Sequence, residues 1–89
     1  MSLEKNIRLA QLFDIYGGLL SKKQYDIMND FLNNDLTLSE VAENRDISRQ
    51  AVKDVVSKVE KKLEDFESKL GVCEKFNQLE NEIKKLKEN

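Results

Sequence analysis

The 89-residue sequence contains no histidine and no proline, a single cysteine, Cys73, and only three glycines. Without histidine, the chain lacks the side chain that most often serves as general base or metal ligand near neutral pH. One cysteine cannot form an internal disulfide and supplies too few thiolates for a zinc cluster. We expect Cys73 to be a buried apolar thiol. The scarcity of helix-breaking residues predicts an all-α fold.

Sequence motifs of catalysis are also missing. The chain has no glycine-rich phosphate loop, no G-x-S-x-G turn and no Cys–His pair. Its many carboxylates alternate with lysines, which is typical of solvated helix faces. We therefore expect a protein that is not an enzyme and that uses no cofactor or metal.

Long hydrophobic runs are absent as well. No stretch approaches the roughly 20 apolar residues of a membrane-spanning helix, and Glu4, Lys5 and Arg8 interrupt any signal-like segment at the start. We expect a cytoplasmic protein without a membrane span. A chain of 89 residues allows one domain, and so small a core is often supplemented by oligomerisation.

Apolar residues at helical spacing predict a first helix from about Leu3 to Tyr16, ended by Gly17 and Gly18. Two capping boxes, one starting at Ser21 and one at Thr37, predict the starts of a second and a third helix. The second helix is expected to end near Leu32, and the short third helix near residue 44. The residues predicted to face inward are Ile7, Leu9, Ala10, Leu12, Phe13, Ile15 and Tyr16 in the first helix, and Tyr25, Met28, Phe31 and Leu32 in the second.

The segment ISRQAVKDVVSKVEKKL, residues 47–63, carries the most functional information. Ser48 is placed to cap a fourth helix, which meets no breaker before Gly71 and so spans about 34 Å. Positive charge gathers here, because residues 48–62 hold five cations and two anions whereas the whole chain has a net charge of −2. One face of the helix is apolar, formed by Ile47, Ala51, Val52, Val55, Val56, Val59 and Leu63.

A short helix, a tight turn and a longer helix with a polar start predict a helix-turn-helix at about residues 37–62. Asp46 occupies the turn position where many such motifs have glycine, and aspartate tolerates left-handed backbone. In this motif the second helix presents its first side chains to base edges in the major groove. Asp54 opposes such binding, because it repels phosphates unless it accepts a hydrogen bond from cytosine. The predicted nucleic-acid contacts are Ser48, Arg49, Gln50, Lys53, Ser57 and Lys58, unless these residues form only a solvated face.

This motif resembles the fourth conserved region of sigma-70-type factors, where a similar helix reads promoter DNA. Residues 3–70 as a whole resemble the YlxM family of bacterial helix-turn-helix proteins, most specifically in LFDIYGGLLSKKQ and ISRQAV. The resemblance implies a sigma-70 region 4-like bundle with a long fourth helix and a C-terminal helical extension. The family's genes lie beside those of the signal recognition particle, which implies a regulatory role in that pathway.

Three functions remain open at this point. The first is a regulator of duplex DNA, with Arg49, Gln50 and Lys53 on base edges and Lys58 on phosphate. The second is a non-catalytic adaptor that binds the RNA or the GTPase of the signal recognition particle. Since a deep A-form groove excludes a helix, RNA binding would depend on phosphate contacts. The third is a purely structural protein that only dimerises.

Residues 71–89 are expected to form a helical extension to a helix-turn-helix domain at residues 1–70. The steps from Cys73 to Phe76 to Leu79 are two threes in succession, which predicts a slip of the heptad register. The apolar stripe exceeds what the small domain can cover, so we expect a homodimer with two-fold symmetry. The predicted dimerisation residues are Phe66, Leu70, Cys73, Phe76, Leu79, Ile83 and Leu86.

Overall fold

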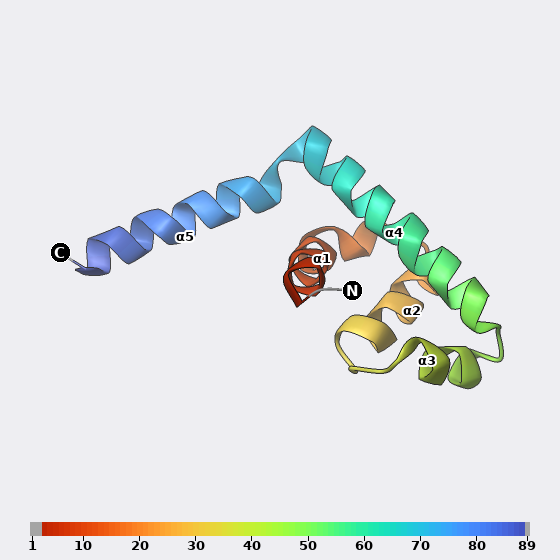
Figure 1. Cartoon of the computed structure of the whole chain (residues 1–89). Coiled ribbons are helices and arrows are strands. Elements are labelled where there is room, and N and C mark those ends of the chain that lie inside the picture. The colour runs from red at the N-terminus through yellow and green to blue at the C-terminus, as the bar shows by residue number, and fades with distance from the viewer. Residues whose placement is uncertain (1–2, 89) are drawn as a thin grey trace.

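The computed structural model describes residues 3–88, which form five α-helices and one short 3-10 turn without any strand. The predicted all-α class and helix boundaries are confirmed to within about a residue. The elements are α1 (Leu3–Tyr16), η1 (Gly17–Leu19), α2 (Lys22–Leu32), α3 (Leu38–Arg45), α4 (Arg49–Leu70) and α5 (Val72–Glu88) (Figure 1).

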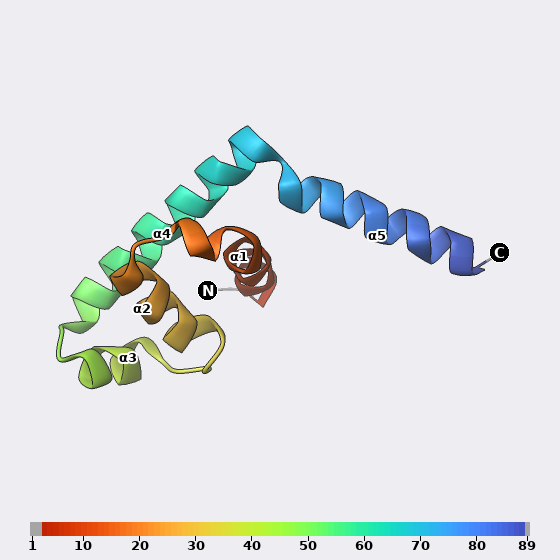
Figure 2. The ribbon, with the colours of Figure 1, turned by 180° about the vertical axis from the view of Figure 1, so that it is seen from behind.

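Helix α4 is the central element of the fold. Helices α1, α2 and α3 all pack against it, and they lie on the same side of it in opposite views (Figures 1 and 2). Its apolar face and that of α1 each supply four of the buried core residues. The buried apolar residues are Leu9, Leu12, Phe13, Tyr16, Ile27, Met28, Val41, Ala42, Val52, Val56, Val59, Leu63 and Cys73.

Both predicted capping boxes are present. The Ser21 hydroxyl accepts a hydrogen bond from the backbone N–H of Gln24 at 3.2 Å, and the Gln24 side chain accepts from the Ser21 N–H at 3.3 Å. Thr37 and Glu40 make the same reciprocal pair, at 3.1 and 3.0 Å. These bonds satisfy amides that have no partner within the helix, so they set where α2 and α3 begin.

The predicted inward faces of α1 and α2 need two corrections. Ile7 and Tyr25 are 53% and 40% exposed. The inward face of α2 is centred instead on Ile27 and Met28, which are almost completely buried. The ring of Tyr25 lies at the edge of the core, with its centroid 5.0 Å from that of Phe13. A shift of the inward face by part of a turn is enough to exchange Tyr25 for Ile27.

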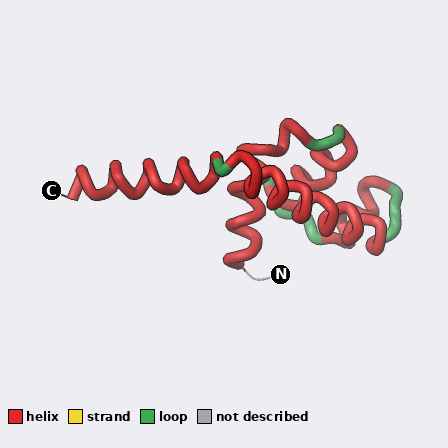
Figure 3. Tube along the Cα trace, turned by 90° about the horizontal axis from the view of Figure 1, so that it is seen from above, coloured by secondary structure: helices red, strands yellow, loops and turns green. Residues whose placement is uncertain are grey.

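Helix α4 ends at Gly71, where the chain changes direction. The backbone of Gly71 is left-handed, with φ 63° and ψ 22°, and its N–H donates to the carbonyl of Glu67. Helix α5 is therefore a separate helix, and it extends away from the other four (Figure 3). Only its first turn returns to the core, where the predicted burial of the Cys73 thiol is confirmed. The chain measures 53 × 25 × 19 Å as a result.

Glu67 and Tyr16 join α4 and α1 to the first turn of α5. The Glu67 carboxylate accepts from the Tyr16 hydroxyl at 2.5 Å and from the backbone N–H groups of Cys73 and Glu74, each at 3.0 Å. The Tyr16 hydroxyl oxygen in turn accepts from the N–H of Val72 at 3.2 Å. The first three amides of α5 thus have partners from two other helices, which fixes the direction in which α5 leaves the core.

Candidate nucleic-acid interface

Helices α3 and α4 meet through a three-residue turn at residues 46–48. Asp46 has φ 53° and ψ 46°, and its N–H donates to the carbonyls of Ala42 and Glu43. The expected left-handed aspartate is therefore confirmed. The N–H of Ile47 also donates to the carbonyl of Ala42, at 3.0 Å, so this turn holds the start of α4 against the end of α3.

An ion pair between Asp30 of α2 and Arg45, the last residue of α3, holds the end of α3 against α2. The Arg45 Nε donates to Asp30 Oδ2 at 2.9 Å, and Nη2 lies 2.9 Å from the same oxygen. The other carboxylate oxygen accepts from the Asn34 side chain at 3.3 Å. Sequence reasoning missed this pair. The available signal was a carboxylate at helical spacing from Ile27, on the face of α2 that carries its buried residues.

All six predicted contact residues are exposed to solvent at or after the start of α4. Arg49, Lys53 and Ser57 follow one another at intervals of four residues, so they form a strip along one side of the helix. Lys58 lies further along, and Ser48 precedes the first turn. The Ser48 hydroxyl accepts from the N–H of Ala51 at 3.0 Å, so its oxygen already serves as the helix cap.

Gln50 is oriented by Asp54. The Gln50 side-chain Nε2 donates to Asp54 Oδ1 at 3.0 Å. The sequence alone predicts only that Asp54 repels phosphates or accepts a hydrogen bond from cytosine. Its observed role is to hold the Gln50 amide along the helix surface, leaving the amide oxygen and the second N–H open to solvent. The spacing of four residues between glutamine and aspartate was the signal for this pair.

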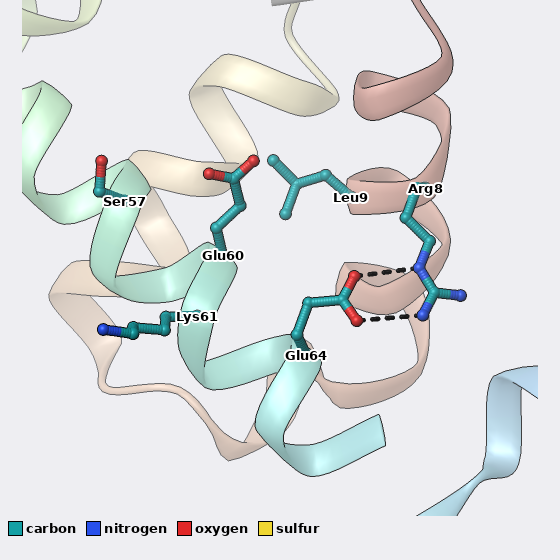
Figure 4. A pocket seen from close by; sticks show the side chains of 6 residues that line it. All are labelled: Arg8, Leu9, Ser57, Glu60, Lys61 and Glu64. Carbon is teal, nitrogen blue, oxygen red and sulfur yellow. Dashed lines mark hydrogen bonds and ion pairs between the residues drawn. The ribbon is translucent and has the colours of Figure 1, made fainter. Parts of the chain in front are cut away.

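A shallow hollow of about 370 Å³ lies beside the strip, between α1 and α4 (Figure 4). Arg8 and Glu64 face each other there in a bidentate pair, with Nε–Oε1 at 3.0 Å and Nη2–Oε2 at 3.1 Å. Because the Arg8 guanidinium donates these hydrogen bonds to the Glu64 carboxylate, the pKa of Arg8 is raised. Ser57 and Lys61 also line the hollow, together with Glu60. Two cations face two carboxylates, so this hollow has no net charge with which to attract an anion.

Residues 3–88 hold no group of three histidine, cysteine, aspartate or glutamate residues arranged to bind a metal ion. The helices in the same residues lack the combination of length and apolar composition that a membrane span requires.

A short α3, a left-handed turn and an α4 with an exposed polar start together define a helix-turn-helix protein. The chain belongs to the UPF0122 family, described as "Putative helix-turn-helix protein, YlxM / p13 like", whose model matches residues 3–89. The resemblance to the YlxM family is thereby confirmed, and it extends through α5.

Relatives in the genus Bacillus support this assignment. A UPF0122 protein of Bacillus velezensis is 44% identical over 88 residues, which cover 99% of this chain and 80% of the relative. Those of Bacillus mycoides and Bacillus thuringiensis are each 43% identical over 86 residues, which cover 97% of this chain and 78% of the relative.

Replacing Ser48 by alanine removes the cap at the start of α4. We expect the free energy of unfolding to fall by about 1 kcal/mol, because the N–H of Ala51 loses its acceptor. Urea denaturation followed by circular dichroism measures this change. Ser57→Ala is the matched control, since Ser57 is exposed within α4 and caps nothing. An unchanged midpoint for Ser48→Ala would contradict the assigned start of the helix.

Proposed function

We propose that this protein is a non-catalytic regulator that binds duplex DNA through the exposed start of α4. The observation that carries the proposal is the strip of Arg49, Lys53 and neighbouring polar residues at the start of α4. Three sets of contacts stabilise the position of this helix start. The Ser48 cap and the turn at Asp46 hold this start directly, and the Asp30–Arg45 pair fixes the end of the preceding helix α3 against α2. A preorganised side-chain array loses little conformational freedom on binding, which favours a contact surface over an idle solvated face.

The chemistry of each side chain suggests its role. Arg49 presents a planar fork that matches the two acceptors of guanine. Gln50 retains an amide oxygen and an N–H, the pair of groups that recognises adenine, and its bond to Asp54 limits the rotamers it can adopt. Lys53 is close enough to the helix start to reach a base or a phosphate. Lys58 lies a turn further along and contacts phosphate only.

Electrostatics favour weak, salt-dependent binding. The start of α4 is basic, but the whole chain has a net charge of −2, whereas dedicated nucleic-acid binders are usually basic overall. Lys62 is also partly held toward α2, since its Nζ lies 3.4 Å from the Gln24 side-chain oxygen. We therefore infer few phosphate contacts, and affinity that depends mainly on Arg49 and Gln50. The regulatory role connected with the signal recognition particle, which the family resemblance implies, is part of this proposal.

Arg49→Ala and Lys53→Ala should each weaken binding without unfolding the protein, because both side chains are exposed on the side of α4 away from the core. For Arg49→Ala we expect a loss of about 1–3 kcal/mol, the discrimination given by one bidentate contact to guanine. Lys58→Ala should flatten the slope of log affinity against log salt by about 0.9, which corresponds to one phosphate. The measurement is a fluorescence anisotropy titration at several salt concentrations.

Lys69→Ala is the matched control for this titration. Lys69 is an exposed cation on the same helix, paired with Asp65 at 3.1 Å and far from the helix start. Each variant is titrated with duplex DNA and with the RNA of the signal recognition particle. Binding curves for Arg49→Ala and Lys53→Ala that coincide with the wild-type curve on DNA would contradict the proposal. Losses confined to the RNA would favour the adaptor function.

A further inference from the structure

Beyond its first turn, α5 carries an apolar stripe that the rest of the chain does not cover. The side chains of this stripe are Val72, Phe76, Leu79, Ile83 and Leu86, which are 44%, 57%, 57%, 53% and 75% exposed. Three of the predicted dimerisation residues lie outside this stripe. Cys73 is 1% exposed, and Phe66 packs against the core with its ring 5.9 Å from that of Tyr16. Leu70, on α4, is exposed at 59% but precedes the turn at Gly71.

The exposed stripe has an uninterrupted heptad spacing. Cys73 faces the core and Val72 takes its place on the outer face, so the steps along the stripe are four, three, four and three residues. The predicted slip of register therefore does not occur on this face. Alternating steps of three and four place Phe76 and Ile83 at heptad position a, and Val72, Leu79 and Leu86 at position d. This is the pattern that two-stranded coiled coils bury.

We propose that α5 pairs with α5 of a second copy of this chain, in register, as a parallel two-stranded coiled coil. The inference goes beyond the proposed function and does not depend on it, because no residue at the start of α4 takes part. After its first turn α5 extends away from the other helices (Figures 1 and 3). Phe76 borders α1 across a hollow that it lines with Gln11 and Ile15, but its side chain is still 57% exposed, so the stripe remains open to a partner.

The charges beside the stripe select the second copy and the parallel direction. Positions g hold Lys75 and Glu82, and positions e hold Glu80 and Lys87. In a parallel pair, position g of one helix faces the following position e of the other. Lys75 then faces Glu80 of the second copy, and Glu82 faces its Lys87. Both contacts occur twice by symmetry, and none of the four side chains makes an ion pair within residues 3–88.

An antiparallel pair would place the same charges unfavourably. In that arrangement e faces e and g faces g. The register that covers Phe76 with Leu86 of the second copy sets Glu80 beside Glu80 and Glu82 beside Glu82. Like charges brought together in this way discriminate against a pairing mode. The charge pattern therefore favours the parallel pair, in which both helix-turn-helix bodies lie at the same end of the coil.

Sedimentation equilibrium tests the pairing on the full chain. A helix of 17 residues is about 25 Å long, so the coil is short and the mass should rise with concentration from 10.4 kDa toward twice that value. Leu79→Glu places a carboxylate in the centre of the stripe and should leave a monomer. Asn81→Glu adds the same charge on the opposite face of α5 and should leave the dimer intact. A wild-type mass of one chain at all concentrations, or a dimer that survives Leu79→Glu, would overturn the proposal.

Disulfide trapping with oxidised glutathione tests the direction. In a parallel coil, the variants Phe76→Cys and Leu86→Cys each bring two identical cysteines together, within the Cα separation that a disulfide needs. Each variant should then form a covalent dimer by itself on a non-reducing gel. Wild type, whose only cysteine is buried, measures the background. Covalent dimers that appear only when the two variants are mixed would overturn the parallel arrangement, because that result requires residue 76 to lie opposite residue 86.

Discussion

Replacing Glu67 by alanine should lower the free energy of unfolding by about 2 kcal/mol and release α5 from its fixed direction. The Glu67 carboxylate accepts hydrogen bonds from the Tyr16 hydroxyl and from two backbone amides at the start of α5. Hydrogen bonds to a charged acceptor contribute about 1.5–3 kcal/mol each in protected sites. Glu67 is only half-buried, so solvent screening reduces the total for the three bonds.

Urea denaturation gives the first measurement, and hydrogen exchange gives the second. The amides of Cys73 and Glu74 should lose protection in Glu67→Ala by more than the global change in stability, because their acceptor is gone. Asp65→Ala is the control, since Asp65 is a carboxylate on the same helix that pairs with the exposed Lys69. Its effect should stay within about 0.5 kcal/mol. Equal effects of the two substitutions would show that Glu67 does not hold α5.

Glu67 should also give the stability a dependence on pH. The Tyr16 hydroxyl donates to its carboxylate and lowers its pKa below the ordinary 4.5, an effect that outweighs the opposing effect of burial. In the unfolded chain the carboxylate therefore takes up a proton at higher pH than in the folded chain. The contribution of Glu67 is fully present above pH 4.5 and is lost as the pH falls through the lower folded pKa. The difference between wild type and Glu67→Ala should shrink over that window.

The largest loss of stability is expected for Leu63→Ala, at about 3 kcal/mol. Leu63 is fully buried on the face of α4 that packs against the other helices, so truncation leaves a cavity that the surrounding residues fill only in part. Leu70→Ala removes the same atoms from the same helix, seven residues later, where the side chain is 59% exposed. We expect that change to stay within about 0.5 kcal/mol.

Urea denaturation at one low protein concentration compares the two variants without a contribution from association. Similar losses for Leu63→Ala and Leu70→Ala would mean that helix propensity, rather than packing, determines the effect. That outcome would place the core away from α4, in contradiction to its contacts with the other three helices.

Local features of this fold were predictable because their partners lie a few residues apart. Ser21, Thr37 and Ser48 each bond to an amide three residues further on, so each helix start could be recognised from its own residues. Asp46 could be expected in a left-handed conformation because a tight turn was required between two helical stretches. Gly71 ended α4 for a similar local reason.

Features that join distant helices could not be predicted in this way. Nothing near Glu67 in sequence indicates that its partner is Tyr16, 51 residues earlier. The Asp30–Arg45 pair likewise requires α2 and α3 to be already in place. The two apolar residues Val72 and Cys73 illustrate a finer limit. Both side chains are apolar, so either could belong to the inward face of the helix. Only the direction of α5 after Gly71 determines that Cys73 faces the core and Val72 faces solvent.

Helix α4 is one uninterrupted helix, and it rigidly connects the candidate contact residues to α5. Its first turn carries Arg49 and Gln50, and its last turn sets the direction of α5. The whole helix has 22 residues and no flexible linker. A partner that binds α5 therefore also determines the orientation of Arg49 and Gln50, which lie at the other end of α4, about 33 Å away. In two copies joined through α5, the distance between the two α4 starts would be set by the angle between α4 and α5 at Gly71. Only DNA targets whose two half-sites are separated by that distance would bind both α4 starts at once.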